Sequence, residues 1–221
     1  MLLQNKRFFV VKENKSSKIV EYNGLKIQMH PEVYEPAEDT FQILEIINID
    51  KSCRVLEIGT GTGIIALECM RRGGFVVCSD VNPFAVELVK KNYEQNKSIL
   101  SGSLDVRLGD LFNVVKDDEI FDVVIFNPPY LPTTKDDLVG GLGWFDIAVD
   151  GGISGLDVTE RFIKKLPGFL GKNGYGLLVF SSLSNRLKLE EIIKNAGFKA
   201  KVVLSRLYDD EHIDVYRISF S

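Results

Sequence analysis

Four residues near the middle of the chain, Asn127-Pro128-Pro129-Tyr130, combine groups suited to holding an NH₂ for reaction. They follow the apolar run "DVVIF", and the two prolines restrict the backbone that leaves it. The side-chain oxygen of Asn127 and the carbonyl of Pro128 are two acceptors that could orient one NH₂, whose lone pair is otherwise delocalised. Tyr130 is placed to pack against a planar amide or base. The same tetrapeptide also suits a rigid turn with Asn127 as a cap, and as a reactive motif it fits glutamine, adenine, cytosine and guanine equally.

A second candidate site is the glycine loop in "VLEIGTGTGIIAL", where Gly59, Gly61 and Gly63 fall between an apolar strand and a helix. Glycine permits positive φ and lets a ligand approach the backbone closely. The spacing is GxGxG, whereas dinucleotide sites typically use GxGxxG. A tight strand-to-helix turn without a ligand is the alternative interpretation.

Acidic residues near the ends of three predicted strands narrow the choice of ligand. Glu57 precedes the glycine loop, where a carboxylate disfavours a pyrophosphate and attracts a cation. Asp80 follows about 20 residues after the loop and could accept hydrogen bonds from ribose hydroxyls. Asp110 could accept from an adenine amino group, with Leu111 and Phe112 packing the ring. Capping or solvent exposure would explain either aspartate alone, but their convergence on one crevice favours S-adenosylmethionine, which carries adenosine, a sulfonium and an amino group but no phosphate.

The elements that would position these residues alternate between strand and helix. We expect strands at 53–59, 74–80, 104–110, 121–127 and 174–182, and helices at 36–49, 63–72, 82–96, 155–169 and 185–198. The runs 199–208 and 213–221 predict a closing hairpin. Near the N-terminus, Asn23-Gly24 between short β-like runs predicts another. This order is typical of an α/β protein with a mostly parallel sheet covered on both faces.

The composition adds general limits. The 221 residues have a net charge of −4, which gives no global electrostatic reason to expect nucleic acid. No apolar run is long enough for a membrane helix, and the N-terminus lacks the features of a signal peptide. The three cysteines form no CxxC pair, and the two histidines form no zinc-like cluster. We therefore expect a cytoplasmic protein with free thiols, no membrane and no metal.

Four segments, "VYEPAEDT", "EIGTGTG", "SDVNP" and "NPPY", resemble the HemK-like family of class I S-adenosylmethionine-dependent methyltransferases, from about residue 33 to the end. The first segment, without a long N-terminal domain, is similar to the archaeal and eukaryotic branch. The resemblance implies a single-domain Rossmann-like fold at 33–221, with seven strands in the order 3-2-1-4-5-7-6 and a short β-hairpin extension at 1–32. It implies methylation of the glutamine in the GGQ motif of class-1 peptide release factors.

The resemblance also implies roles outside the motifs. In the family, "VYEPAEDT" closes over the cofactor, so Thr40 is carried over as a contact and Tyr34 as a weaker one; Asn127 is expected to face both cofactor and substrate. Family members of this branch pair with a small zinc-binding activator subunit beside the third strand, here 103–108, which otherwise is a plain edge strand. The glycine-rich stretch 131–155 is expected to be irregular and to contact substrate, with Trp144 as a packing anchor or a substrate contact.

Three other functions stay open at this point. The chain could be a DNA or RNA amino-methyltransferase, although it has no obvious target-recognition domain. It could methylate lysine, as is reported for eukaryotic relatives, although an amide-shaped acceptor pair supplies no obvious base. It could be a cofactor-binding scaffold without catalysis, against which the intact Asn127 argues.

Overall fold

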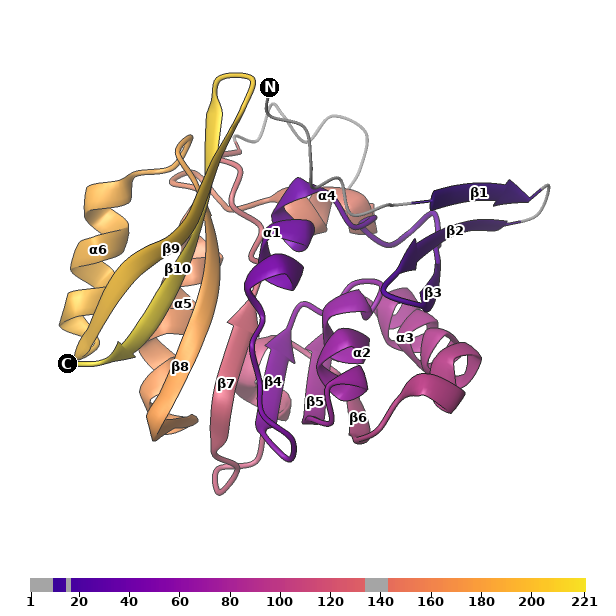
Figure 1. Cartoon of the computed structure of the whole chain (residues 1–221). Helices are drawn as coiled ribbons and strands as arrows, with labels where there is room; N and C mark the ends of the chain where they lie inside the picture. Colours follow the sequence, from indigo (N-terminus) through magenta and orange to yellow (C-terminus); the bar gives the residue numbers. More distant parts are fainter. Residues whose placement is uncertain (1–9, 15–16, 134–142) are drawn as a thin grey trace, which may run out of the picture.

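The computed structural model describes residues 10–14, 17–133 and 143–221, with side chains from residue 18 onward. Its centre is a seven-stranded sheet in the order β6-β5-β4-β7-β8-β10-β9, which confirms the predicted order 3-2-1-4-5-7-6 (Figure 1). The first five strands run parallel, and β10 is antiparallel to both of its neighbours. The strands are β4 (Arg54–Ile58), β5 (Phe75–Asp80), β6 (Ser103–Leu108), β7 (Phe121–Phe126), β8 (Leu170–Ser181), β9 (Phe198–Tyr208) and β10 (Glu211–Phe220).

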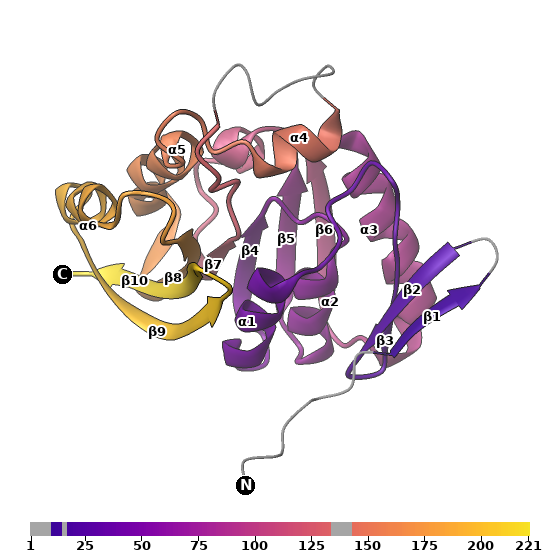
Figure 2. The ribbon, with the colours of Figure 1, turned by 90° about the horizontal axis from the view of Figure 1, so that it is seen from above.

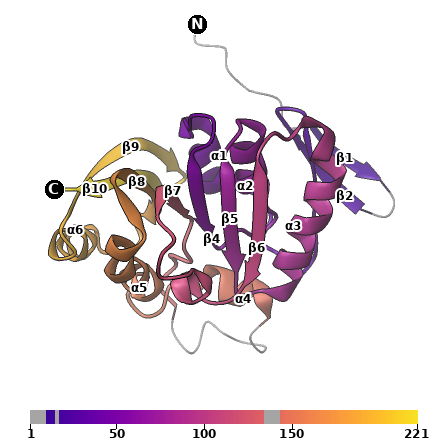
Figure 3. The same cartoon turned by 90° about the horizontal axis from the view of Figure 1, so that it is seen from below.

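Helices cover both faces of this sheet, as expected for strands that are apolar on both sides (Figure 2). Side chains alternate along each strand, so Val55 of β4 joins one apolar cluster while Leu56 joins the other. One face carries α1 (Glu38–Ile46), α2 (Ile64–Arg71) and α3 (Pro83–Asn96), and the other carries α5 (Asp157–Lys165) and α6 (Arg186–Asn195). Figure 3 shows both layers from the opposite side. Short 3₁₀ turns lie at Lys97–Ile99, Leu111–Val114 and Leu166–Gly168.

A small antiparallel sheet precedes this core. It contains β1 (Val10–Asn14), β2 (Ser17–Tyr22) and β3 (Leu25–Gln28) in that order. The predicted turn at Asn23-Gly24 is present, with φ values of 48° and 85° that suit a tight hairpin between right-twisted strands.

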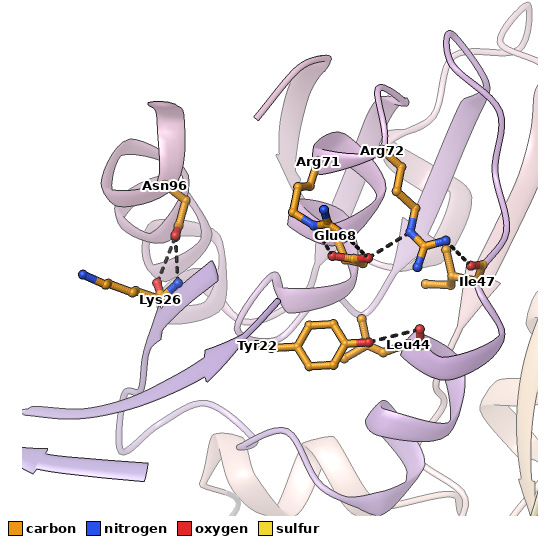
Figure 4. Close-up of polar contacts among 8 residues, drawn as sticks. All are labelled: Tyr22, Lys26, Leu44, Ile47, Glu68, Arg71, Arg72 and Asn96. Atoms are coloured by element: carbon orange, nitrogen blue, oxygen red, sulfur yellow. Dashed lines mark hydrogen bonds and ion pairs between the residues drawn. The ribbon is translucent and has the colours of Figure 1, made fainter. Parts of the chain in front are cut away.

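Two asparagines of α3 form hydrogen bonds with the backbone N–H and C=O groups at the outer edge of β3. Asn96 accepts from the Lys26 N–H and donates to the Lys26 carbonyl, each at 2.8 Å (Figure 4). Asn92, one turn earlier, does the same for Gln28 at 2.8 and 3.1 Å. Both side chains are almost fully buried. The helix therefore replaces a fourth strand and fastens the N-terminal sheet to the core.

A buried carboxylate joins the first two helices. Glu68 is fully buried and accepts hydrogen bonds from Arg71 and Arg72, and Arg72 also donates to the Ile47 carbonyl at 2.6 Å (Figure 4). Burial alone would raise the pKa of Glu68, but the two guanidinium groups lower it overall. The end of α1 is thereby held against α2, which fixes the helix that begins beside the site described next.

The stretch 131–155 differs from the prediction of an irregular loop. Residues 134–142 lie outside the described residues, but Trp144–Val149 form a short helix, α4, and the backbone at Leu131 bridges to Asp150. The prediction is therefore wrong for Trp144–Val149, where Asp146 at the third helical position accepts from the Gly143 N–H, while residues 151–155 are irregular as expected. Among the helices that the structure describes, none is long and apolar enough to cross a membrane.

Candidate active site

A cavity of about 580 Å³ opens at the carboxyl ends of the parallel strands, beneath α4 and beside the start of α1. In open α/β sheets this is the crevice where ligands bind. The structure brings to it almost every residue singled out from sequence: Tyr34, Thr40, Glu57, Gly59, Gly61, Asp80, Asp110, Leu111, Asn127, Pro128, Pro129, Tyr130 and Trp144. Gly63 and Phe112 are the exceptions; Phe112, expected to pack the adenine ring, is buried against Phe162 and Phe169 and does not line the cavity. The contacts of these residues with a ligand stay predictions. The local geometry indicates which role each residue can have.

The three loop glycines all have positive φ, at 66°, 52° and 80° for Gly59, Gly61 and Gly63. A Cβ on Gly61 would meet only the Tyr34 carbonyl oxygen, at an ordinary contact distance of 3.8 Å, and Gly61 lines the cavity, so the ligand-facing interpretation fits this position. A Cβ on Gly63 would lie 2.9 Å from Val89 of α3. Gly63 therefore serves close packing of α2 on α3, and its position does not support a direct ligand contact.

Asp80 fixes the loop as well as facing the cavity. Its Oδ2 accepts from the Gly61 N–H and its Oδ1 from the Asn82 N–H, both at 2.9 Å. Burial raises the pKa of Asp80, and the backbone hydrogen bonds partly oppose that shift. Each carboxylate oxygen can accept a further hydrogen bond, so this structural role leaves acceptor capacity for ribose hydroxyls.

Glu57 is 2% exposed at the end of β4, with its Oε2 accepting from the Thr60 hydroxyl at 2.7 Å. Burial raises its pKa to about 8, against the hydrogen bonds from Thr60 and the Ala66 backbone that lower it. The carboxyl is therefore largely protonated at neutral pH in the free protein. A cation bound beside it would favour the charged form.

The predicted adenine end contains a pairing that the sequence did not indicate. Asp110 forms an ion pair with Arg161 of α5, and both residues line the cavity. Arg161 is the only cationic side chain among the described residues that do so. Leu111 has a φ of 48°, uncommon for a residue with a side chain, and is 8% exposed. This strained backbone turns an apolar side chain toward the same space.

At the acceptor end, Asn127 and Tyr130 share one partner. Asn127 Nδ2 donates to Asp39 Oδ2 at 2.9 Å, and the Tyr130 hydroxyl donates to the same oxygen at 3.1 Å. Asn127 Oδ1 is buried and has no hydrogen-bond partner among the described residues. Burial and the charge of Asp39 raise the pKa of Tyr130, which stays a donor. Asn127 lines the cavity, and its amide oxygen is the acceptor that the described residues leave without a partner there.

Two acidic groups at this end were missed from sequence. Asp39 is one of the acidic residues of "VYEPAEDT", and its distance of 88 residues from Asn127 hides the contact between them. Glu211, at the first position of β10, lines the cavity, and its Oε1 is buried without a partner among the described residues. Its charge contributes to the raised pKa values of Tyr34 and Tyr130, after burial and Asp39. No motif marks this position.

Comparisons with known proteins agree with this architecture. Residues 31–140 match the model of the methyltransferase small domain. The chain is 40% identical over 185 residues to a putative protein N5-glutamine methyltransferase of Methanocaldococcus jannaschii, covering 83% of this chain and 90% of that protein. The chain belongs to the HemK-like family of methyltransferases. The human member, methyltransferase HEMK2, is 30% identical over 201 residues, covering 86% of this chain and 91% of its own length.

A solved structure extends the likeness of this HemK-like protein to the fold. It is the E. cuniculi Mtq2–Trm112 complex, described as responsible for methylation of the translation termination factor eRF1. The match has a TM-score of 0.65 and 25% identity, covering 86% of this chain and 99% of that one. The predicted fold and family are thereby confirmed, and the protein is a methyltransferase.

Proposed function

We propose that this protein transfers a methyl group from S-adenosylmethionine to the side-chain amide nitrogen of a glutamine, the GGQ glutamine of a class-1 release factor. The observation that carries the proposal is the acceptor face of Asn127. Its Nδ2 is engaged by Asp39, while its Oδ1 is buried and has no partner among the described residues. An unpaired buried acceptor is costly, and an NH₂ donor is the group that would satisfy it.

The cavity fits S-adenosylmethionine better than a phosphate-bearing cofactor. Glu57, Asp80 and Asp110 line it, and its one cationic side chain among the described residues, Arg161, is already paired with Asp110. A pyrophosphate would find no free cation there, whereas a ligand with a sulfonium and an ammonium meets carboxyl groups. When bound, the cofactor supplies an electrophilic methyl group.

The protein's own groups would then orient the acceptor. Asn127 Oδ1 accepts one N–H of the substrate amide, and the Pro128 carbonyl is the proposed second acceptor. Pro128 is buried in the cavity wall, next to Pro129 and Tyr130. Holding the nitrogen in line in this way contributes several kcal/mol to lowering a barrier, on the order of the gains known for pre-oriented reactants. No strong base is needed, because the nitrogen becomes acidic once it is methylated and cationic.

The choice of glutamine rests on the relatives, because the acceptor pair suits any NH₂. The relatives named above are described as a protein N5-glutamine methyltransferase and as a complex acting on eRF1. A release-factor substrate would place the protein in the cytoplasm, where translation terminates.

A partner is part of the proposal, because the similar solved structure is a complex with a second protein, Trm112, and the edge of the sheet is the proposed place for it. β6 is the edge strand, and Leu108 on it is 54% exposed, while Phe75 at the start of the neighbouring β5 is 47% exposed. A small zinc-binding activator that adds a strand to β6 would pair with the backbone N–H and C=O groups along the outer edge of β6. It would also cover apolar side chains such as Leu108 and Phe75. Replacing Phe75 by aspartate, far from the carboxyl ends of the strands, should weaken co-purification with such a subunit and leave cofactor binding intact. Unchanged co-purification would place the partner elsewhere.

The direct test is transfer of labelled methyl to a panel of acceptors, with and without the activator. The panel contains a release factor, the same factor with its GGQ glutamine replaced, a histone, duplex DNA and tRNA. Label on the unaltered release factor alone supports the proposal. Label on nucleic acid or histone alone would show that the substrate is not glutamine. No label on any acceptor would favour a cofactor-binding scaffold without catalysis.

A further inference from the structure

Asp39 is the second residue of α1 and is 3% exposed, yet it lines the acceptor end of the cavity. Its Oδ2 accepts from Asn127 Nδ2 at 2.9 Å and from the Tyr130 hydroxyl at 3.1 Å. Its Oδ1 accepts from the backbone N–H of Thr40 at 2.6 Å and from the Thr40 hydroxyl at 3.2 Å. Four donors therefore occupy the carboxylate, which leaves it little capacity to bind substrate or to accept a proton from it.

This contact decides which way the Asn127 amide faces. A side-chain amide has an oxygen and an NH₂ of nearly equal shape, so its orientation follows from its partners. An ionised carboxylate only accepts hydrogen bonds, so the NH₂ of Asn127 must turn toward Asp39 and the oxygen must turn away. Oδ1 is the buried atom that has no partner among the described residues. In the opposite orientation, Nδ2 would face the donor NH₂ of a substrate and repel it.

We propose that Asp39 is a positioning residue that locks Asn127 with its oxygen toward the methyl acceptor. The charge of Asp39 also polarises the Asn127 amide, which makes Oδ1 a stronger acceptor in a site shielded from water. Tyr130 joins the same oxygen and steadies the wall of the acceptor pocket. Through Thr40, the lock is attached to the segment proposed to contact the cofactor. The inference rests on the proposed function in one respect: it requires an NH₂ acceptor, whichever molecule carries it.

The kinetic test compares Asp39→Asn with Glu38→Gln. Asparagine keeps the shape of Asp39 but can donate as well as accept, so it permits the reversed orientation of Asn127. Glu38→Gln removes the same charge from the adjacent, exposed residue of the same helix turn. For Asp39→Asn we expect kcat to fall about a hundred-fold, the loss typical of a misplaced reacting group, with cofactor affinity within about five-fold of wild type. Glu38→Gln should retain wild-type kcat. Equal kcat values for Asp39→Asn and wild type would overturn the inference.

A third variant separates the two donors. Tyr130→Phe removes one hydrogen bond from Asp39 but leaves its contact with Asn127. We expect a fall in kcat below about ten-fold, in line with the loss of a single hydrogen bond of about 1 kcal/mol. A loss as large as that of Asp39→Asn would show that the phenol, rather than the orientation of Asn127, is the group that Asp39 serves.

A spectroscopic measurement tests the lock without any methyl transfer. The side-chain NH₂ signals of Asn127 can be assigned by their absence in Asn127→Ala. In the wild type, one of these protons should resonate downfield and exchange slowly, because it is donated to a buried carboxylate. In Asp39→Asn that proton should move and exchange faster. A wild-type Asn127 NH₂ that behaves like exposed asparagines would refute the lock even if Asp39→Asn does not fold. If the lock is present and the label goes to an amino group of DNA or tRNA in place of the glutamine, the proposed function fails and this inference stands.

Discussion

Replacing Glu57 by glutamine should change how the stability of the free protein depends on pH. Glu57 is 2% exposed, and burial raises its pKa to about 8, from a value of 4.5 for the unburied group. A raised pKa means that the folded state holds a proton that the unfolded state releases. The stabilising contribution is therefore complete below pH 4.5 and is lost as pH rises through about 8.

The two pKa values set the size of the effect. Between pH 5.5 and pH 7.5 the linkage relation gives a loss of about 2.5 kcal/mol in the free energy of unfolding from this group alone. The glutamine of Glu57→Gln cannot titrate. The free energy of unfolding of the wild type, relative to that of the variant, should therefore fall by about this amount between pH 5.5 and pH 7.5. Glu68 and Glu119, whose pKa values are lowered, titrate equally in both proteins and cancel in the difference.

Urea denaturation at closely spaced pH values measures the difference directly. A second result follows because a bound cation favours the charged form of Glu57. S-adenosylmethionine binding at pH 7 should release close to one proton from the wild type and almost none from Glu57→Gln. Calorimetry in buffers of different ionisation enthalpy reports this number. If the free energy of unfolding changes with pH in the same way for wild type and Glu57→Gln, Glu57 titrates normally. If both proteins release the same number of protons on binding, the charge of the ligand does not affect the ionisation of Glu57.

Five further variants test the remaining assignments. Asn127→Ala should abolish methyl transfer while cofactor affinity stays within a few-fold; if calorimetry shows that affinity collapses too, this asparagine holds the cofactor or the fold. Asp80→Ala should weaken cofactor binding first and also lower stability by about 1–3 kcal/mol, because two backbone N–H groups lose their acceptor; unchanged affinity removes the ribose assignment. Gly61→Ala should reduce cofactor affinity, whereas Gly63→Ala should mainly lower the melting temperature, since its Cβ would lie 2.9 Å from a valine of α3; the reverse pattern contradicts the division of roles in the loop. Asn92→Ala should destabilise by about 1–3 kcal/mol and expose the N-terminal sheet to proteolysis, because the polar edge of β3 loses its partner; wild-type protease resistance would show that the sheet is held by other contacts.

Much of the fold could be predicted because local and global signals agree. Continuous apolar runs such as "VVIF" mark strands buried on both faces, and the turn at Asn23-Gly24 and the cap at Asn82 are specified by adjacent residues. Helix α4 escaped prediction because glycines surround it and its six residues show no clear period. Such short elements depend on contacts that sequence spacing does not reveal.

The candidate site likewise contains residues that the sequence could predict and residues that it could not. Residues at strand ends could be predicted, since parallel strands deliver their carboxyl ends to one crevice. Asp39, Arg161 and Glu211 could not. Asp39 is 88 residues from its partner Asn127, and Arg161 and Glu211 reach the cavity from a helix and a hairpin that carry no motif. The sequence also could not show that Gly63 packs against α3 while Gly61 lines the cavity, because both occupy equivalent places in the repeat.

The central claim is that the buried oxygen of Asn127 holds a glutamine NH₂ for methylation. Tandem mass spectrometry of a release factor incubated with the enzyme, its activator and S-adenosylmethionine tests this most directly. The account predicts one added methyl on the side-chain nitrogen of the GGQ glutamine, absent with Asn127→Ala and absent when that glutamine is replaced by glutamate. A methyl group on any other atom of the factor, or one that persists with Asn127→Ala, would contradict it.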